Sequence, residues 1–273
     1  MTTNTLLRIC LPAIIPALLV LCCSQQHNRA GDKASSGTEN TGTHHDTTGN
    51  HDSLIDLQYL LGQFEPSTHP LFSKIDKELT NITEGYLRTE ALEAFRKMHQ
   101  AAGEENIKLT IVSATRNFNH QKRIWEAKWN GTTLVDGKDL RTVKDHHERA
   151  RIILKYSSMP GTSRHHWGTD IDINSVNPEY FEKPEGKKVY DWLAENAGDY
   201  GFCQTYTKKD SLRKTGYEEE PWHWSYTPVS SALLNKYKSI VKPEDIKGFK
   251  GDKTVVGVRM IEEYVVGINP LCK

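Results

Sequence analysis

The sequence predicts an α+β domain in which a small, mainly antiparallel sheet is flanked by helices. Apolar residues at helical spacing predict several helices, and short alternating segments predict strands. The two kinds of element are mixed without the regular strand–helix–strand spacing of a parallel sheet, and no internal repeat is visible. A single folded domain is favoured, because the N-terminal stretch differs in composition from the rest of the chain.

Four segments are expected to be helical. Apolar residues recur with helical spacing from Leu87 to Ala102, and Gly103 can end this helix. A second helix is expected from a cap at Asn119 to about Trp129. The other two are expected over residues 143–156 and 187–196.

Four segments are expected to be extended. Ile107, Leu109 and Ile111 alternate with polar neighbours, which is the period of a half-buried strand, and this strand would carry residues 113–116 at its end. The remaining strands are expected over residues 169–174, 202–207 and 222–226.

The net charge of the chain does not indicate a class of binding partner. Lys plus Arg equals Asp plus Glu at 35 each, so no global field steers the protein toward nucleic acid or an anionic bilayer. No nucleic-acid partner is expected, and the partner must be chosen by a local site.

The N-terminus indicates the compartment. The apolar run Leu11 to Leu21 is too short to span a bilayer but suits a signal peptide. It ends in Cys22 and Cys23, which resembles a bacterial lipobox. Residues 1–23 are therefore expected to be a lipoprotein-type signal peptide, with Cys23 carrying a lipid that anchors the protein to a membrane of the bacterial cell envelope, on the periplasmic side or at the cell surface. The alternative is an ordinary secretory signal with incidental cysteines, and either interpretation places the protein outside the cytoplasm.

Residues 24–52 are rich in Ser, Thr, Gly, Asn and His and contain almost nothing apolar, so they are expected to form a flexible tether. The folded domain is expected over residues 53–273. Only Cys203 and Cys272 remain within it, and in an oxidising compartment they can form a disulfide or stay free.

Two clusters of residues carry the chemistry. In the first, a turn with Ser163, His165 and Gly168 leads into Asp170 and Asp172, which point to the same face if this segment is extended. A loop before them can bring His165 over to meet one aspartate.

The second cluster follows about fifty residues later, where Glu220 precedes His223. Catalytic zinc needs three nitrogen or oxygen ligands and an open position for water, and His165, Asp172 and His223 meet that need. Glu220 then fits the general base, and Arg116 can supply a fixed cation for the negative charge that develops on a carbonyl oxygen. Each residue alone has a structural alternative, such as a hydrogen-bonded core histidine or an aspartate that caps a turn.

The joint pattern resembles a known family. Ser163-x-His165-x-x-Gly168-x-x-x-Asp172 with Glu220-x-x-His223, preceded by Ser113-x-x-Arg116 and Gln121, resembles the VanY-type D-alanyl-D-alanine carboxypeptidases and their L,D-carboxypeptidase relatives. The resemblance covers about residues 85–240.

The resemblance implies a role for each matching residue. His165, Asp172 and His223 would bind Zn²⁺, Glu220 would be the catalytic base, and Arg116, Gln121 and Ser163 would contact the terminal residue of the substrate. It also implies the small α+β fold shared with the hedgehog signalling domain. One departure concerns Asp170, where the family usually has a small residue such as Ala; the spacing from His165 favours Asp172 as the ligand.

Three classes of function remain open. The favoured one is a zinc carboxypeptidase that removes the terminal D-alanine from peptidoglycan stem peptides, because Arg116, Gln121 and Ser163 can hold a free carboxylate. An endopeptidase that cuts within stems or cross-links is the second. A non-catalytic zinc module that binds peptide or glycan is the third, and Glu220 argues against it because a binding module has no use for a base there.

Overall fold

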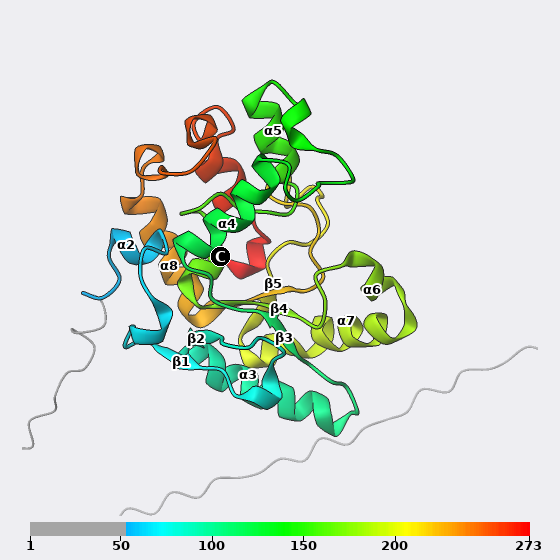
Figure 1. Cartoon of the computed structure of the whole chain (residues 1–273). Helices are drawn as coiled ribbons and strands as arrows, with labels where there is room; N and C mark the ends of the chain where they lie inside the picture. Colours follow the sequence, from blue (N-terminus) through cyan, green and yellow to red (C-terminus); the bar gives the residue numbers. More distant parts are fainter. Residues whose placement is uncertain (1–52) are drawn as a thin grey trace, which may run out of the picture. The chain divides into compact units, whose positions relative to one another are not determined.

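The computed structural model describes residues 53–273 (Figure 1). The expected signal peptide (1–23) and tether (24–52) lie outside the described residues. The predicted α+β class is confirmed, because two small antiparallel sheets are flanked by helices. Within the described part of the chain, no helix combines the length and the apolar character that a membrane crossing requires.

The central sheet has four strands in the order β3-β4-β6-β5, and every neighbouring pair is antiparallel. The strands are β3 (Ile111–Ser113), β4 (Asp170–Ile173), β5 (Phe202–Gln204) and β6 (His223–Tyr226). A separate two-stranded sheet pairs β1 (Phe72–Lys74) with β2 (Tyr86–Arg88).

The first expected strand was placed too early, since β3 begins at Ile111 and residues 107–110 form no ladder. Its partner β4 ends at Ile173, because Asn174 adopts a left-handed conformation with φ 62°. The side chain of Asn174 then accepts a hydrogen bond from the Thr110 amide at 2.7 Å, in place of a further strand residue. The expected strands over 169–174, 202–207 and 222–226 exist but are shorter.

The helices flank the central sheet. The described helices longer than one turn are α3 (Thr89–Glu104), α4 (Phe118–Trp129), α5 (His146–Ile153), α6 (Pro178–Glu182), α7 (Pro184–Asn196) and α8 (Thr227–Ile240), and a single turn, α2 (Leu57–Leu60), precedes them.

The expected starts of α3 and α4 were wrong. Leu87 belongs to β2, so α3 starts two residues later than the spacing predicted. Helix α4 is capped by Asn117, whose side chain accepts a hydrogen bond from the His120 amide, and not by Asn119.

The helix expected over 143–156 is also shorter. The Asp145 side chain accepts hydrogen bonds from the amides of His147 and Glu148, which starts α5 at His146. The helix ends at Ile153. Helix α7 is longer than expected, because it starts at Pro184 and not at residue 187. Proline is favoured in the first turn of a helix.

The sheet has one apolar and one polar face. Ile171, Ile173 and Trp224 pack into a cluster with buried residues of α3 and α7, and Figure 1 shows these two helices on one side of the sheet, with α4 and α5 on the other. Because side chains alternate along a strand, Asp170 and Asp172 point to the opposite face. The fold therefore presents these two aspartates on the side of the sheet that faces α4.

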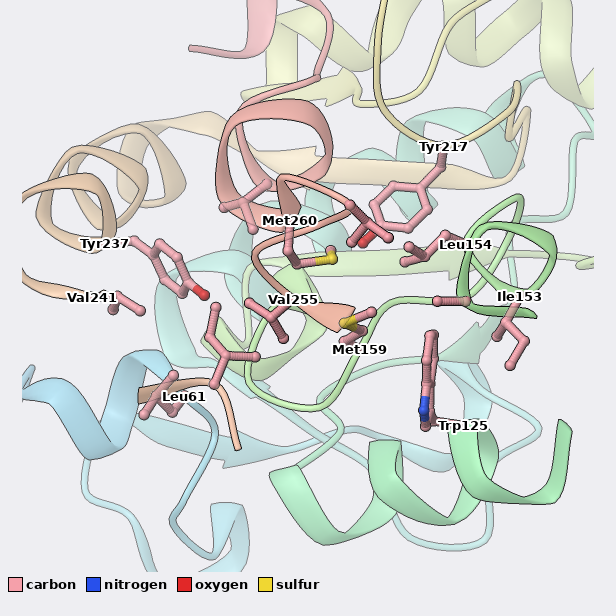
Figure 2. Packing of buried hydrophobic residues seen from close by; sticks show 14 of the residues in the cluster. Leu61, Trp125, Ile153, Leu154, Met159, Tyr217, Tyr237, Val241, Val255 and Met260 are labelled. Atoms are coloured by element: carbon pink, nitrogen blue, oxygen red, sulfur yellow. The ribbon is translucent and has the colours of Figure 1, made fainter. Parts of the chain in front are cut away.

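A second apolar cluster stabilises the part of the molecule beyond this polar face. It joins α4, α5 and α8 to the C-terminal segment, and Figure 2 shows Met159, Val255 and Met260 within it. The C-terminal segment consists of short 3₁₀ turns and a π-helical stretch, Met260–Val265.

A disulfide joins the sheet to the C-terminal segment. Cys203 in β5 is bonded to Cys272, 69 residues away in the sequence. The structure thus shows the disulfide, which is one of the two alternatives that the sequence left open.

We expect the double variant Cys203→Ser/Cys272→Ser to fold with reduced stability. A loop of this length restricts the unfolded chain, and the chain-entropy relation gives a loss of about 4 kcal/mol when the bond is removed. Urea unfolding of the wild type and the variant measures the difference, with the wild type in reductant as a second comparison. A variant with the midpoint and slope of the oxidised wild type would contradict the expectation.

Candidate active site

The register of the central sheet brings distant parts of the sequence into one row. Asp172 in the middle strand β4 lies directly opposite Ser113 of β3 on one side and His223 of β6 on the other. Asp170 lies opposite Ser225 in the same way. The two sequence clusters, about fifty residues apart, therefore meet on adjacent strands.

His165 reaches this row from a short turn. It lies in a 3₁₀ turn, Arg164–Trp167, which ends at Gly168 with φ 75°. A Cβ atom at this glycine would collide with the ring of Phe72 and would oppose the left-handed backbone conformation. Gly168 therefore allows the chain to turn sharply from His165 into β4.

Three side-chain atoms converge and can hold a metal ion. His165, Asp172 and His223 are all buried, and their ligand atoms lie within 4.8 Å of one another. Asp172 Oδ1 is 3.4 Å from His165 Nε2 and 3.2 Å from His223 Nδ1. This oxygen has no hydrogen-bond partner among the described residues, which fits an atom that is directed at a cation.

The other nitrogen of each imidazole is already occupied. His165 Nδ1 lies 2.9 Å from the Ala114 carbonyl oxygen, and His223 Nε2 lies 2.9 Å from Asp170 Oδ2. Each of these nitrogens donates to its oxygen when the imidazole is neutral, because a carbonyl and a carboxylate can only accept. In this neutral form, His165 Nε2 and His223 Nδ1 have lone pairs that face Asp172.

Asp170 is held in a buried network below His223. Its Oδ2 accepts a hydrogen bond from Arg164 Nε at 2.9 Å, and its Oδ1 accepts from the hydroxyls of Thr169 and Ser225 at 2.7 and 2.8 Å. Burial alone would raise the pKa of Asp170, but the Arg164 charge and the His223 contact outweigh it and lower that pKa. Asp170 is therefore an ionised carboxylate that binds the far nitrogen of His223.

Electrostatics within the row follow from burial and close pairing. Burial alone would raise the pKa of Asp172, but the two histidines hold it well below its usual range. Burial lowers the pKa of His165. For His223 burial acts in the same direction, but the contacts with Asp170, Asp172 and Glu220 outweigh it and raise its pKa.

Glu220 lies beside the row. Its Oε2 is 3.3 Å from His223 Nδ1, and its backbone is held by a hydrogen bond from its amide to the Tyr206 carbonyl at 2.9 Å. Burial raises the pKa of its carboxyl group, and the contact with His223 offsets this only in part. A carboxylate with a raised pKa in a pocket has the character of a general base.

Arg116 is anchored at the end of the segment that follows β3. Its Nε donates to Gln121 Oε1 at 3.0 Å, its Nη1 donates to Ser113 Oγ at 2.6 Å, and Nη1 lies 3.7 Å from Asp172 Oδ2. Ser163 is buried, and its hydroxyl has no partner among the described residues.

His166 fixes the backbone of this arginine. Its Nε2 accepts a hydrogen bond from the Gly161 amide, so its Nδ1 carries the proton and donates to the Arg116 carbonyl. Burial lowers the pKa of His166 to about 3, which keeps the ring neutral. This histidine is a structural residue of the site.

The three possible metal ligands line one pocket of about 450 Å³ together with Glu220 and Arg116. The structure brings together every residue that the sequence analysis selected, as the pocket is lined by Arg116, Gln121, Ser163, His165, Asp172, Glu220 and His223. Val176, Pro178 and Trp222 add apolar walls. Lys128 and Arg164 also line the pocket, and Arg164 is paired with Asp170.

Comparison with known proteins agrees with this geometry. The family model VanY, D-alanyl-D-alanine carboxypeptidase, matches residues 84–229, which is more than half of the chain. The chain belongs to this family. The resemblance predicted from the sequence is thereby confirmed.

Individual curated proteins are moderately similar to the chain. The chain is 32% identical over 194 residues to YodJ of Bacillus subtilis (strain 168), covering 67% of this chain and 62% of YodJ. It is 32% identical over 119 residues to a D-alanyl-D-alanine carboxypeptidase of Enterococcus faecium, covering 44% of this chain and 38% of that protein. The chain therefore spans less than two thirds of the length of these curated relatives.

Among solved structures, the LdcB LD-carboxypeptidase aligns with a TM-score of 0.46 and 25% identity, covering 66% of this chain and 81% of that chain. VanYB in complex with D-alanine-D-alanine aligns with a TM-score of 0.44 and 24% identity, covering 61% of this chain and 91% of that chain.

Sequence reasoning missed two members of the site. Arg164 was not selected, although an arginine next to His165 and a charged Asp170 in place of the usual small residue together indicate a buried ion pair. Lys128 was also missed; its spacing of seven residues from Gln121 places both on one face of α4.

We expect the two aspartates to affect metal binding unequally. Asp172→Asn should lose most of the metal, because the converging oxygen loses its charge, whereas Asp170→Asn should weaken binding by only roughly 10- to 100-fold through His223. Titration of Zn²⁺ against a competing chelator measures both variants, and thermal unfolding checks that each is folded. Equal losses, or a greater loss in Asp170→Asn, would contradict the assignment.

Proposed function

We propose that this protein is a zinc-dependent carboxypeptidase that removes the terminal D-alanine from peptidoglycan stem peptides. The observation that carries the proposal is that one pocket contains a His-Asp-His donor set, a buried carboxylate outside that set and an anchored arginine. The name of the family supports the substrate class.

His165, Asp172 and His223 would hold the ion. Two imidazoles and one carboxylate are a donor set typical of catalytic zinc, and the unpartnered Asp172 Oδ1 fits a cation. When bound, Zn²⁺ supplies a Lewis acid that polarises the peptide carbonyl and lowers the pKa of a water molecule.

Glu220 moves the proton. Its carboxylate lies beside His223 Nδ1 but is not one of the three ligands, so it can take a proton from the attacking water. The raised pKa that burial gives Glu220 then allows it to return this proton to the nitrogen of the departing D-alanine.

Arg116, Gln121 and Ser163 bind the end of the substrate. Gln121 and Ser113 hold the guanidinium in place, and the free Ser163 hydroxyl can donate a hydrogen bond to a carboxylate. Arg116 also lies close to Asp172, a proposed metal ligand, and therefore close to the place where the substrate carbonyl would be polarised. Its positive charge would stabilise the negative charge that develops on the carbonyl oxygen.

The experiment that tests the function uses peptides that differ only at the C-terminus. The zinc-loaded protein is incubated with a stem pentapeptide as the free acid, with its C-terminal amide and with cross-linked dimers, and the products are identified by mass. We expect release of D-alanine from the free acid and little cleavage of the amide. Preferred cleavage of the dimers would favour an endopeptidase, and binding without cleavage of any substrate would favour a non-catalytic module.

We expect Glu220→Gln to retain zinc and substrate binding while kcat falls by roughly 10² to 10⁴, the range of general acid–base catalysis. The loss should appear in kcat and not mainly in KM, because proton transfer belongs to the transition state. Steady-state kinetics and metal analysis of the purified variant measure both. Loss of zinc would make Glu220 a ligand, and a wild-type rate would place the base elsewhere.

We also propose that the mature protein begins at Cys23 and is anchored by lipid in the bacterial cell envelope. The support is the apolar run that ends in two cysteines, and a peptidoglycan substrate lies in the same compartment. Cells fed a fatty-acid analogue should label the wild type but not Cys23→Ser. An unlabelled wild type that is soluble in the periplasm would contradict anchoring.

A further inference from the structure

Lys128 is a half-buried lysine in the wall of the candidate active site. It lies on the same face of α4 as Gln121 and Ile124, and all three line the pocket. Because helical side chains lean toward the N-terminus of their helix, Lys128 reaches back in the direction of Gln121.

The ammonium group has no carboxylate partner among residues 53–273. Its Nζ donates one hydrogen bond, to Ser157 Oγ at 2.5 Å, although an ammonium has three donors. Asp136 also lines the pocket, but its carboxylate is bound by Lys155 at 2.9 Å. A partly buried ammonium group is usually paired with an anion. The remaining donors of the Lys128 ammonium group are therefore available to a ligand.

Lys128 is connected to the same wall as Arg116. Gln121 accepts a hydrogen bond from Arg116 and donates one to the Ser158 carbonyl at 2.8 Å, and Ser158 follows the serine that binds Lys128. Burial and, after it, the charge of Arg116 lower the pKa of Lys128. The Glu220 and Asp136 charges act on Lys128 in the opposite direction and offset part of this effect. Lys128 and Arg116 are thus two cations that act on one pocket.

We propose that Lys128 is a second carboxylate-binding group, which together with Arg116 holds the C-terminal carboxylate of the substrate. This inference rests on the proposed carboxypeptidase function and names a determinant of its specificity for free chain ends. A negative charge between the two cations relieves their repulsion and satisfies donors of both. A C-terminal amide carries no charge, so it gains much less from this site.

The test uses the zinc-loaded protein and an acylated peptide that ends in D-Ala-D-Ala, as the free acid and as the amide. Lys128→Met keeps a long side chain and removes the charge. It should raise KM for the acid by roughly 10- to 100-fold, the strength of a charge-assisted hydrogen bond, with kcat changed much less. The carboxylate is present in both the ground state and the transition state, which is why KM carries the effect.

Two further variants separate recognition from structure. Lys122→Met is the matched control, because Lys122 lies on the same helix and also donates a hydrogen bond, to the Gly248 carbonyl, but does not line the pocket. It should leave KM unchanged. Lys128→Arg retains the charge and should restore most of the affinity for the acid.

Binding measured in the Glu220→Gln background keeps the question separate from turnover. Calorimetric titration with the acid and the amide should show that Lys128→Met loses affinity for the acid alone. An unchanged preference for the acid in Lys128→Met would overturn the role of Lys128 and leave the carboxypeptidase intact. Equal affinity of the parent protein for acid and amide, with no release of D-alanine by wild type, would overturn the proposed function itself.

Discussion

A hydrogen bond between Asp170 and His223, 2.9 Å long and buried from water, determines which nitrogen of the histidine faces the pocket. Asp170 occupies Nε2, so Nδ1 is left beside Asp172 Oδ1 and Glu220 Oε2. A buried carboxylate is costly unless it is paired, and Arg164 provides the pairing from the same turn that carries His165. The orientation of the metal-facing imidazole therefore depends on a buried ion pair whose two members are outside the proposed ligand set.

The sheet makes this arrangement possible. Alternation along β4 separates Ile171 and Ile173, which pack against α3 and α7, from Asp170 and Asp172, which face the site. A shift of one residue in the pairing of β4 would move both aspartates into the apolar cluster. The packing energy of the helices on the far face thus also maintains the geometry of the polar row.

Much of the site could be predicted from the sequence because its members lie in two short motifs. The spacing of His165, Asp172 and His223 reflects local rules, a turn that enters a strand and a second strand beside it. The helix periodicity of α3 was equally visible, since Phe95 and Met98 lie on one buried face. Each motif and the helix periodicity depend on neighbours within a few residues, whereas the pairing of Asp172 with His223 joins positions about fifty residues apart.

The features that were missed depend on contacts that the sequence does not display. β1 and β2 have three residues each, too few to show an alternating pattern. The C-terminal segment lacks a regular period because it is built of short turns, although Val255 and Met260 are buried in the core (Figure 2). Helix α4 is capped by Asn117, two residues before the predicted cap, because the Asn117 side chain accepts a hydrogen bond from the His120 amide.

The most direct measurement of the central claim is a crystal structure of the zinc-loaded protein with anomalous data collected at the zinc edge. We predict a single ion in the pocket, bound by His165 Nε2, Asp172 and His223 Nδ1, with Asp170 still bound to His223 Nε2 and Glu220 outside the ligand set. An ion bound by Asp170 or Glu220, or by the Nε2 atom of His223, would contradict the account.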